Sequence, residues 1–188
     1  MTSIIKVDNI QNSSGTSSMS IASNGFVIPP AGGIIQTQYT QIDATSQWTT
    51  NANTDKAISS LAVNITPTST NSIIKLEAMV NGEWGSQGAI YNSAWFFFRD
   101  STKLGTTQSG STTSGILMGT ALTYEASDTS STPEHANYMY FDSPSSTSQI
   151  TYTVGVITSS QTYWYLNRCV TATAEKGMSV ITATEIAG

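Results

Sequence analysis

The chain has 188 residues, which is enough for one ordinary domain with a small appendage. Only 10% of the residues are charged and 38% are hydrophobic, a composition that excludes both a disordered tail and a membrane protein. The net charge is −5 and the seven Lys and Arg residues are scattered, so we expect no nucleic-acid partner. Apolar stretches are short, so we also expect no membrane insertion.

A single cysteine, Cys169, excludes an internal disulfide and a cysteine-based zinc site. Because it lies in an apolar run, we expect a buried thiol rather than a nucleophile. The first residues lack a basic region followed by a long apolar core, so we expect no signal peptide and synthesis in a cytoplasm.

The first part of the chain differs in composition from the rest. Residues 4–10 are expected to form a short strand, and residues 19–28 a second one that passes through Asn24-Gly25, a dipeptide typical of hairpin turns. The Pro- and Gly-rich residues 29–33 are expected to act as a hinge. We therefore divide the chain into an N-terminal attachment and oligomerisation segment, residues 1–33, and a head domain, residues 34–188.

An isolated hairpin of this size cannot bury its own apolar side chains. These side chains need a partner, which is the head, another copy of the chain or a larger assembly. We favour the last two. Four apolar residues of the first strand are the candidates for attachment: Ile4, Ile5, Val7 and Ile10.

The head has almost no helix signals and many alternating strands. Apolar residues alternate with small or polar ones over residues 59–65, 74–80, 150–156 and 180–184. The polar residues 66–71 are expected to join two strands as a hairpin loop. We expect about nine strands between residues 34 and 186, which indicates an all-β antiparallel β-sandwich with a jelly-roll-like topology.

Catalytic and metal-binding patterns are weak. One acidic cluster lies in a Ser- and Thr-rich loop and comprises Glu125, Asp128, Glu134 and His135. Its oxygens are suited to Ca²⁺, but the spacing of a known calcium loop is lacking, so a solvated loop is the simpler interpretation. His135 is the only histidine, and no Gly-x-Ser-x-Gly motif accompanies it. We therefore expect no enzyme activity, no catalytic residue, no bound metal and no cofactor.

The aromatic residues have two possible roles. Trp84 and Tyr91 border a glycine-rich stretch that we expect to be a loop, where exposed rings stack on sugar faces or contact a receptor. Strand aromatics such as Phe96, Phe98 and Trp164 are instead expected to fill the core of the sandwich.

Several motifs, in their order along the chain, resemble those of one protein family. They are residues 3–16 (SIIKVDNIQNSSGT), 34–39 (IIQTQY), 61–69, 72–76, 140–144 (YFDSP), 151–154, 166–168 and 179–186. This order resembles tail-fibre and other virion-appendage proteins of marine bacteriophages. The resemblance covers both ends and most of the middle of the chain, but the stretches 82–93 and 106–133 do not match.

The resemblance implies a non-enzymatic homotrimer on the virion surface, with a trimeric jelly-roll-like head and an attachment segment that contacts other virion proteins through residues 1–33. The head implied by the family often touches a host surface glycan or protein. Our candidates for that contact lie in the unmatched loops: Trp84, Tyr91, Tyr124 and His135.

The chain lacks a long shaft, so we expect a short tail fibre or a fibre-like appendage. A capsid or tail decoration or cement protein with no receptor role is the alternative. A free carbohydrate-binding module or a sugar-cleaving enzyme is a third hypothesis, and the weak arrangement of acids speaks against cleavage.

Overall fold

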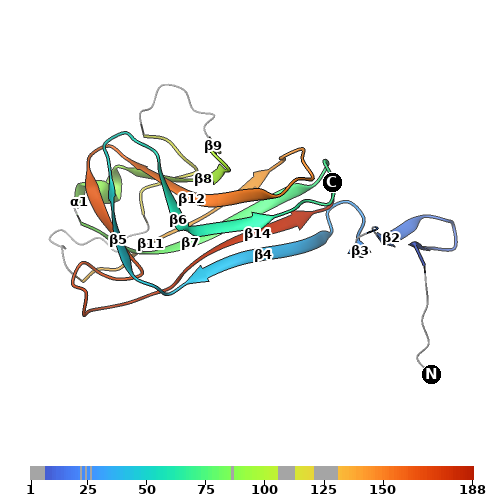
Figure 1. The fold of residues 1–188 in the computed structure, drawn as a ribbon, viewed down its shortest axis with the longest axis horizontal. Helices are drawn as coiled ribbons and strands as arrows, with labels where there is room; N and C mark the ends of the chain where they lie inside the picture. Colours follow the sequence, from blue (N-terminus) through green and yellow to red (C-terminus); the bar gives the residue numbers. More distant parts are fainter. Residues whose placement is uncertain are drawn as a thin grey trace.

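A computed structural model describes residues 7–21, 23, 25, 27–85, 87–105, 113–120 and 131–188. The regular secondary structure of this part of the chain is almost entirely β-strand, which confirms the all-β prediction (Figure 1). Three strands near the N-terminus form a small antiparallel sheet in the order β1-β2-β3: β1 (Asn9–Gln11), β2 (Ser17–Ile21) and β3 (Val27–Ile28). The remaining strands form two larger antiparallel sheets that pack as a sandwich.

The first large sheet, here called the β7 sheet, has the order β4-β14-β7-β13-β5, and β11 pairs with the other side of β7. Its strands are β4 (Ile34–Ile42), β5 (Ser46–Thr50), β7 (Ile73–Trp84), β11 (Glu134–Asp142), β13 (Thr162–Leu166) and β14 (Ser179–Ile186). The second, here called the β12 sheet, has the order β10-β8-β12-β6, with β9 beside β8. Its strands are β6 (Lys56–Ile65), β8 (Ser93–Arg99), β9 (Thr102–Lys103), β10 (Leu117–Met118) and β12 (Ile150–Thr158).

The chain crosses between the two large sheets repeatedly, as in a jelly roll. The long strands β4, β7, β11 and β14 lie in one sheet. Strands β6, β8 and β12, which come between them along the chain, lie in the other. The prediction of a hairpin at residues 66–71 is therefore wrong, because β6 pairs with β12 while β7 pairs with β14 and β11. A turn signal marks where the chain reverses, but the pairing of each strand depends on distant segments.

The core lies between the two sheets. Alternate residues of β7, including Ile74, Leu76 and Val80, are fully buried, as their alternation predicted. The hydroxyl of Tyr138 on β11 donates a hydrogen bond of 2.9 Å to the carbonyl of Phe96 on β8, and so links the two sheets through the core. Two strands of only two residues each, β9 and β10, raise the number of strands above the nine that were predicted.

The small sheet projects from the end of the sandwich where β4 begins and β14 ends (Figure 1). Among the described residues, its strands pair only with each other. The Gly32 N–H donates to the Ala187 carbonyl at 2.7 Å, and the Ala187 N–H donates to the Gly33 carbonyl at 2.8 Å. The expected hinge at residues 29–33 is thus hydrogen-bonded at its C-terminal end to the head, next to the last strand.

Candidate functional site

The predicted acidic cluster has two members among the described residues, Glu134 and His135, and these two do not share a site. These residues are neighbours on β11, and neighbouring strand residues point to opposite faces. Glu134 is buried and accepts a hydrogen bond of 3.1 Å from the backbone N–H of Trp84, whereas His135 is exposed. Glu125 and Asp128 lie outside the described residues. Over the described ranges, no three or more His, Cys, Asp or Glu residues are placed to hold a metal ion.

The four predicted receptor-contact residues differ in where they lie. The prediction that Trp84 faces outward from a loop is wrong, because it ends strand β7 and its side chain is only 2% exposed. Tyr91 is the last residue of the short helix α1 (Gln87–Tyr91) and is 55% exposed. His135 is also exposed, and Tyr124 lies outside the described residues.

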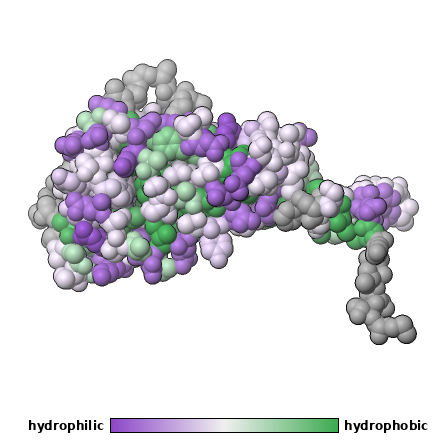
Figure 2. All heavy atoms as spheres, viewed as in Figure 1, coloured by the Kyte–Doolittle hydropathy of each residue, from purple (hydrophilic) through white to green (hydrophobic). Residues whose placement is uncertain are grey.

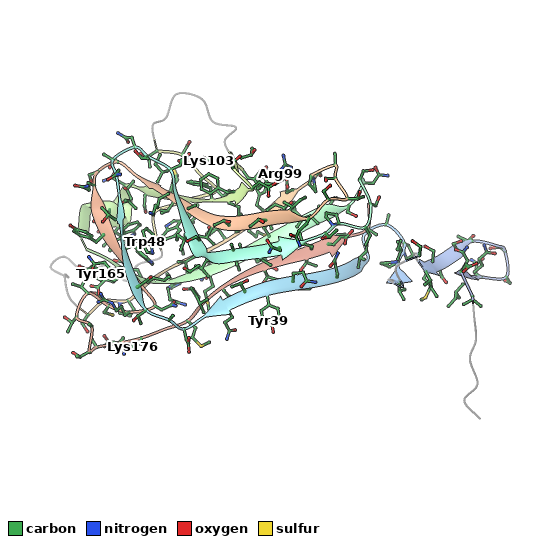
Figure 3. All side chains as sticks on the ribbon, in the orientation of Figure 1. Tyr39, Trp48, Arg99, Lys103, Tyr165 and Lys176 are labelled. Atoms are coloured by element: carbon green, nitrogen blue, oxygen red, sulfur yellow. The ribbon has the colours of Figure 1, made fainter. Side chains whose placement is uncertain are left out.

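All four tryptophans meet at one end of the core, which sequence reasoning missed. They come from four strands: Trp48 from β5, Trp84 from β7, Trp95 from β8 and Trp164 from β13. The ring centroids of Trp84 and Trp164 are 4.8 Å apart, and those of Trp95 and Trp164 are 5.2 Å apart. None of the four indole N–H groups has a hydrogen-bond partner among the described residues. The cluster therefore gains its stability from packing, and it closes the end of the head opposite the small sheet (Figure 3).

Exposed aromatic side chains lie at this same end of the head. Tyr163 and Tyr165 alternate with the buried Trp164 on β13, so their rings point outward, and Tyr163 is 48% exposed. The Gly85 N–H donates to the Tyr163 carbonyl at 2.8 Å, and the Arg168 guanidinium lies 4.5 Å from the centroid of the Tyr165 ring. Such rings suit contacts with sugars or with protein partners.

The surface of the β7 sheet that faces away from the core carries large apolar side chains. We call this surface the outer face and define it by eight residues: Tyr39, Lys75, Glu77, Met79, Met139, Phe141, Val180 and Thr182. Met139, Glu77, Thr182 and Tyr39 form one row across four adjacent strands. Tyr39 projects from β4 away from the sandwich (Figure 3).

A groove of about 450 Å³ runs along the outer face, with Met79, Met139 and Val180 among its lining residues. The two charged residues of the face are paired with each other, since Lys75 Nζ lies 2.9 Å from Glu77 Oε1. The outer face is therefore apolar at its margins and electrically neutral as a whole.

A second groove, of about 550 Å³, lies between strands β4 and β6. Amide and hydroxyl groups dominate its lining: Gln36, Gln38, Asn64, Thr66, Thr68, Thr147 and Gln149. Its lining comes from the start of β4 and the end of β6, which lie at the end of the head near the small sheet, whereas β5, the partner of β13, lies at the opposite end (Figure 1).

The small N-terminal sheet exposes most of its apolar side chains. Four residues of its strands and Val7, which precedes β1, are between 36% and 48% exposed: Val7, Ile10, Met19, Ile21 and Val27. The predicted attachment residues Val7 and Ile10 are thus available to a partner, and Ile4 and Ile5 lie outside the described residues. Figure 2 shows hydrophobic residues on the surface of this projecting sheet.

The buried ionisable groups hold the scaffold together. Asp142 accepts hydrogen bonds from the Arg99 guanidinium at 3.0 Å and from the Tyr152 hydroxyl at 2.7 Å, and so joins β11 to β8 and β12. Burial raises the pKa of Tyr152 well above its ordinary value, and the hydrogen bond to Asp142 raises it further. This tyrosine therefore stays neutral and serves as a structural donor.

No protein-family model and no curated protein sequence matches this chain at a significant level. Within the described residues, no helix is long and apolar enough to cross a membrane.

Proposed function

We propose that this protein is a non-enzymatic structural protein of a bacteriophage virion, a short tail fibre or fibre-like appendage. Residues 1–33 attach it to other virion proteins, and the head is presented at the surface of the particle as part of a homotrimer. The order of the sequence motifs supports this function, and so does the division of the described chain into a compact head and a small projecting sheet.

The observation that carries the proposal is the exposed apolar surface of the small sheet. A three-stranded sheet this short has no core of its own, so side chains such as Val7, Ile10 and Val27 remain in water in the isolated chain. Burying a half-exposed Val or Ile side chain contributes about 1 kcal/mol, so several of them together provide a usable attachment energy. A sheet that projects from one end of the head is placed to make that contact without obstructing the head.

The opposite end of the head is the part we assign to the host surface. Tyr91 and Tyr163 are exposed there, and tyrosine rings supply large contact areas at low conformational-entropy cost. An appendage with three copies would bind a glycan or protein receptor at three sites. Weak individual contacts would then give a strong overall affinity. Trp84 does not contribute to this receptor contact, because its side chain lies in the core.

Incorporation into particles is the direct test. Phage particles from the source culture are purified on a density gradient, and this chain is quantified by mass spectrometry against the major capsid protein. We expect a fixed stoichiometry, and we expect Ile10→Asp with Val27→Asp to abolish incorporation while Tyr163→Asp does not. A chain that is absent from purified particles overturns the proposal.

Two further assays separate the functions of an incorporated chain. Binding of the purified protein to host cells distinguishes an attachment protein from a decoration protein, which would not bind. Release of reducing ends from host polysaccharide would contradict the non-enzymatic assignment.

A further inference from the structure

We infer that the outer face of the β7 sheet is the surface through which copies of this chain associate. The inference rests on the proposed appendage function and deepens it by assigning the interface between its subunits. Side chains as large as Tyr39, Met139 and Phe141 are 70%, 51% and 54% exposed on this face, and on β11 the residues that alternate with Met139, such as Ala136 and Tyr138, are buried. Met79, Met139 and Val180 line one groove on this face, and large exposed apolar side chains gathered on one sheet surface mark a contact site.

The charge distribution favours a second copy as the occupant. The chain carries a net charge of −5, so two copies repel each other through most of their surfaces. The outer face is an exception, because Lys75 and Glu77 are its two charged members and cancel each other. In an assembly of identical chains, the Lys75 of one copy can also face the Glu77 of the next, which makes the face complementary to itself.

The size of the face fits a specific interface. Four strands spaced about 4.8 Å apart and nine residues long present roughly 20 Å by 30 Å of sheet. This flat area of about 600 Å² is of the order of the ~800 Å² that each partner contributes to a standard protein–protein interface, and in a cyclic trimer it is shared between the contacts with two neighbours. The groove of about 450 Å³ along the face gives the large side chains of another copy a place to insert.

The position of the small sheet fits the same arrangement. Strand β4 is an edge strand of this face and follows the small sheet after only residues 29–33. In a cyclic trimer with its outer faces turned to the axis, the Met139 half of one face meets the Tyr39 half of the next. Such a trimer gathers its three small sheets at one end, where a single virion partner can bind them together.

The test is the solution mass of the full-length chain from 1 to 100 µM, measured by sedimentation velocity. We expect the wild type to form a trimer of about 60 kDa, three times the 20.0 kDa of one chain. Met139→Lys combined with Tyr39→Lys should weaken association at least 100-fold, because it places charges in the interface. The control is Tyr163→Lys on β13, an aromatic off this face that is 48% exposed, which should leave the mass unchanged.

Each result decides the inference separately from the proposed function. Monomeric outer-face variants that still unfold cooperatively, beside a trimeric wild type and control, support it. An oligomer that survives the outer-face changes overturns it, and so does a wild type that stays monomeric at 100 µM. Neither of these results bears on incorporation into particles, which decides whether the chain is a virion protein. A monomeric wild type would contradict only the homotrimer in the proposed function.

A cysteine pair tests which halves of the face meet. Met139 and Tyr39 lie in one row three strand spacings apart, roughly 14 Å, which is too far for a disulfide within one chain. Met139→Cys with Tyr39→Cys should therefore give covalent dimers and trimers under mild oxidation. The control pair, Tyr163→Cys with Tyr39→Cys, should remain monomeric on a non-reducing gel. Equal cross-linking of both pairs would contradict the assigned contact.

Discussion

The hydroxyl of Ser72 donates a hydrogen bond of 2.6 Å to Oε1 of Glu185, which fixes the residue before β7 to the last strand of the chain. The same carboxylate accepts hydrogen bonds from the N–H and the hydroxyl of Thr68, both at 2.7 Å, and from the Gln36 amide at 2.6 Å. Burial raises the pKa of Glu185, but these hydrogen bonds outweigh it and hold the pKa below the ordinary value. Glu185 is therefore an anion that organises the end of the head next to the small sheet.

Glu185→Gln should destabilise the fold by about 2–3 kcal/mol, because the new NH₂ group faces donors and leaves them unpaired in a buried place. Urea unfolding at pH 7 measures the change. The matched control is Asp43→Asn, which also removes one negative charge but at an exposed position, and it should change stability by less than about 0.5 kcal/mol. Equal effects of the two substitutions would contradict the structural role of Glu185.

Stability should fall at acidic pH in a way that depends on Glu185. Its pKa is lower in the folded chain than its ordinary value of 4.5, so its contribution is fully present above about pH 4.5. That contribution is lost as the pH falls through the folded pKa. The midpoint of thermal unfolding, followed by circular dichroism between pH 7 and pH 3, should therefore fall more steeply in the wild type than in Glu185→Gln. Parallel curves would show that other groups cause the acid sensitivity.

Gly82→Ala should disrupt the tryptophan cluster. A Cβ atom at this position would lie 2.5 Å from the Trp164 ring and 2.5 Å from the Tyr165 carbonyl, so the neighbours must move. We expect a loss of about 1–3 kcal/mol, typical of overpacking, and a weaker near-ultraviolet circular dichroism signal from the indoles. Gly85→Ala is the control, because its Cβ would meet its nearest atoms at 3.3 Å. Similar losses in both variants would count against the close contact at Gly82.

The thiol of Cys169 should be inert in the native protein. It is fully buried, and burial raises its pKa to about 12, with further contributions from the hydrogen bond to Glu175 and from the charges of Glu83 and Glu175. The reactive thiolate is therefore scarce at pH 8. We expect no reaction with Ellman's reagent at pH 8 until denaturant is added, and then one thiol for each chain. Rapid reaction of the native protein would contradict this environment.

Local pattern was enough to predict most strands. Alternation over residues 74–80 placed Leu76 and Glu77 on opposite faces, because successive side chains of a strand point to opposite faces, and Leu76 is indeed buried. Scarce helix signals excluded a helical fold, and the apolar run around Cys169 predicted its burial.

The tertiary structure decided what the local pattern left open. Trp84 borders a glycine-rich stretch that does not match the family motifs, so the sequence indicated a loop there. In the structure, tryptophans from β5, β8 and β13 surround its ring and place it in the core. The turn at residues 66–71 indicated a hairpin, but the chain crosses there to the other sheet. No short window of sequence contains those partners.

For the outer face too, the sequence predicted the strands, and the tertiary structure decided which residues share one surface. The sequence by itself determined that Met139 and Tyr39 lie on strands, since side-chain alternation is a property of neighbouring residues. Only the sheet order placed them in one row, with Glu77 and Thr182 between them, because strand pairing joins segments about one hundred residues apart. A surface able to bind another copy therefore exists only once β4, β14, β7 and β11 have paired.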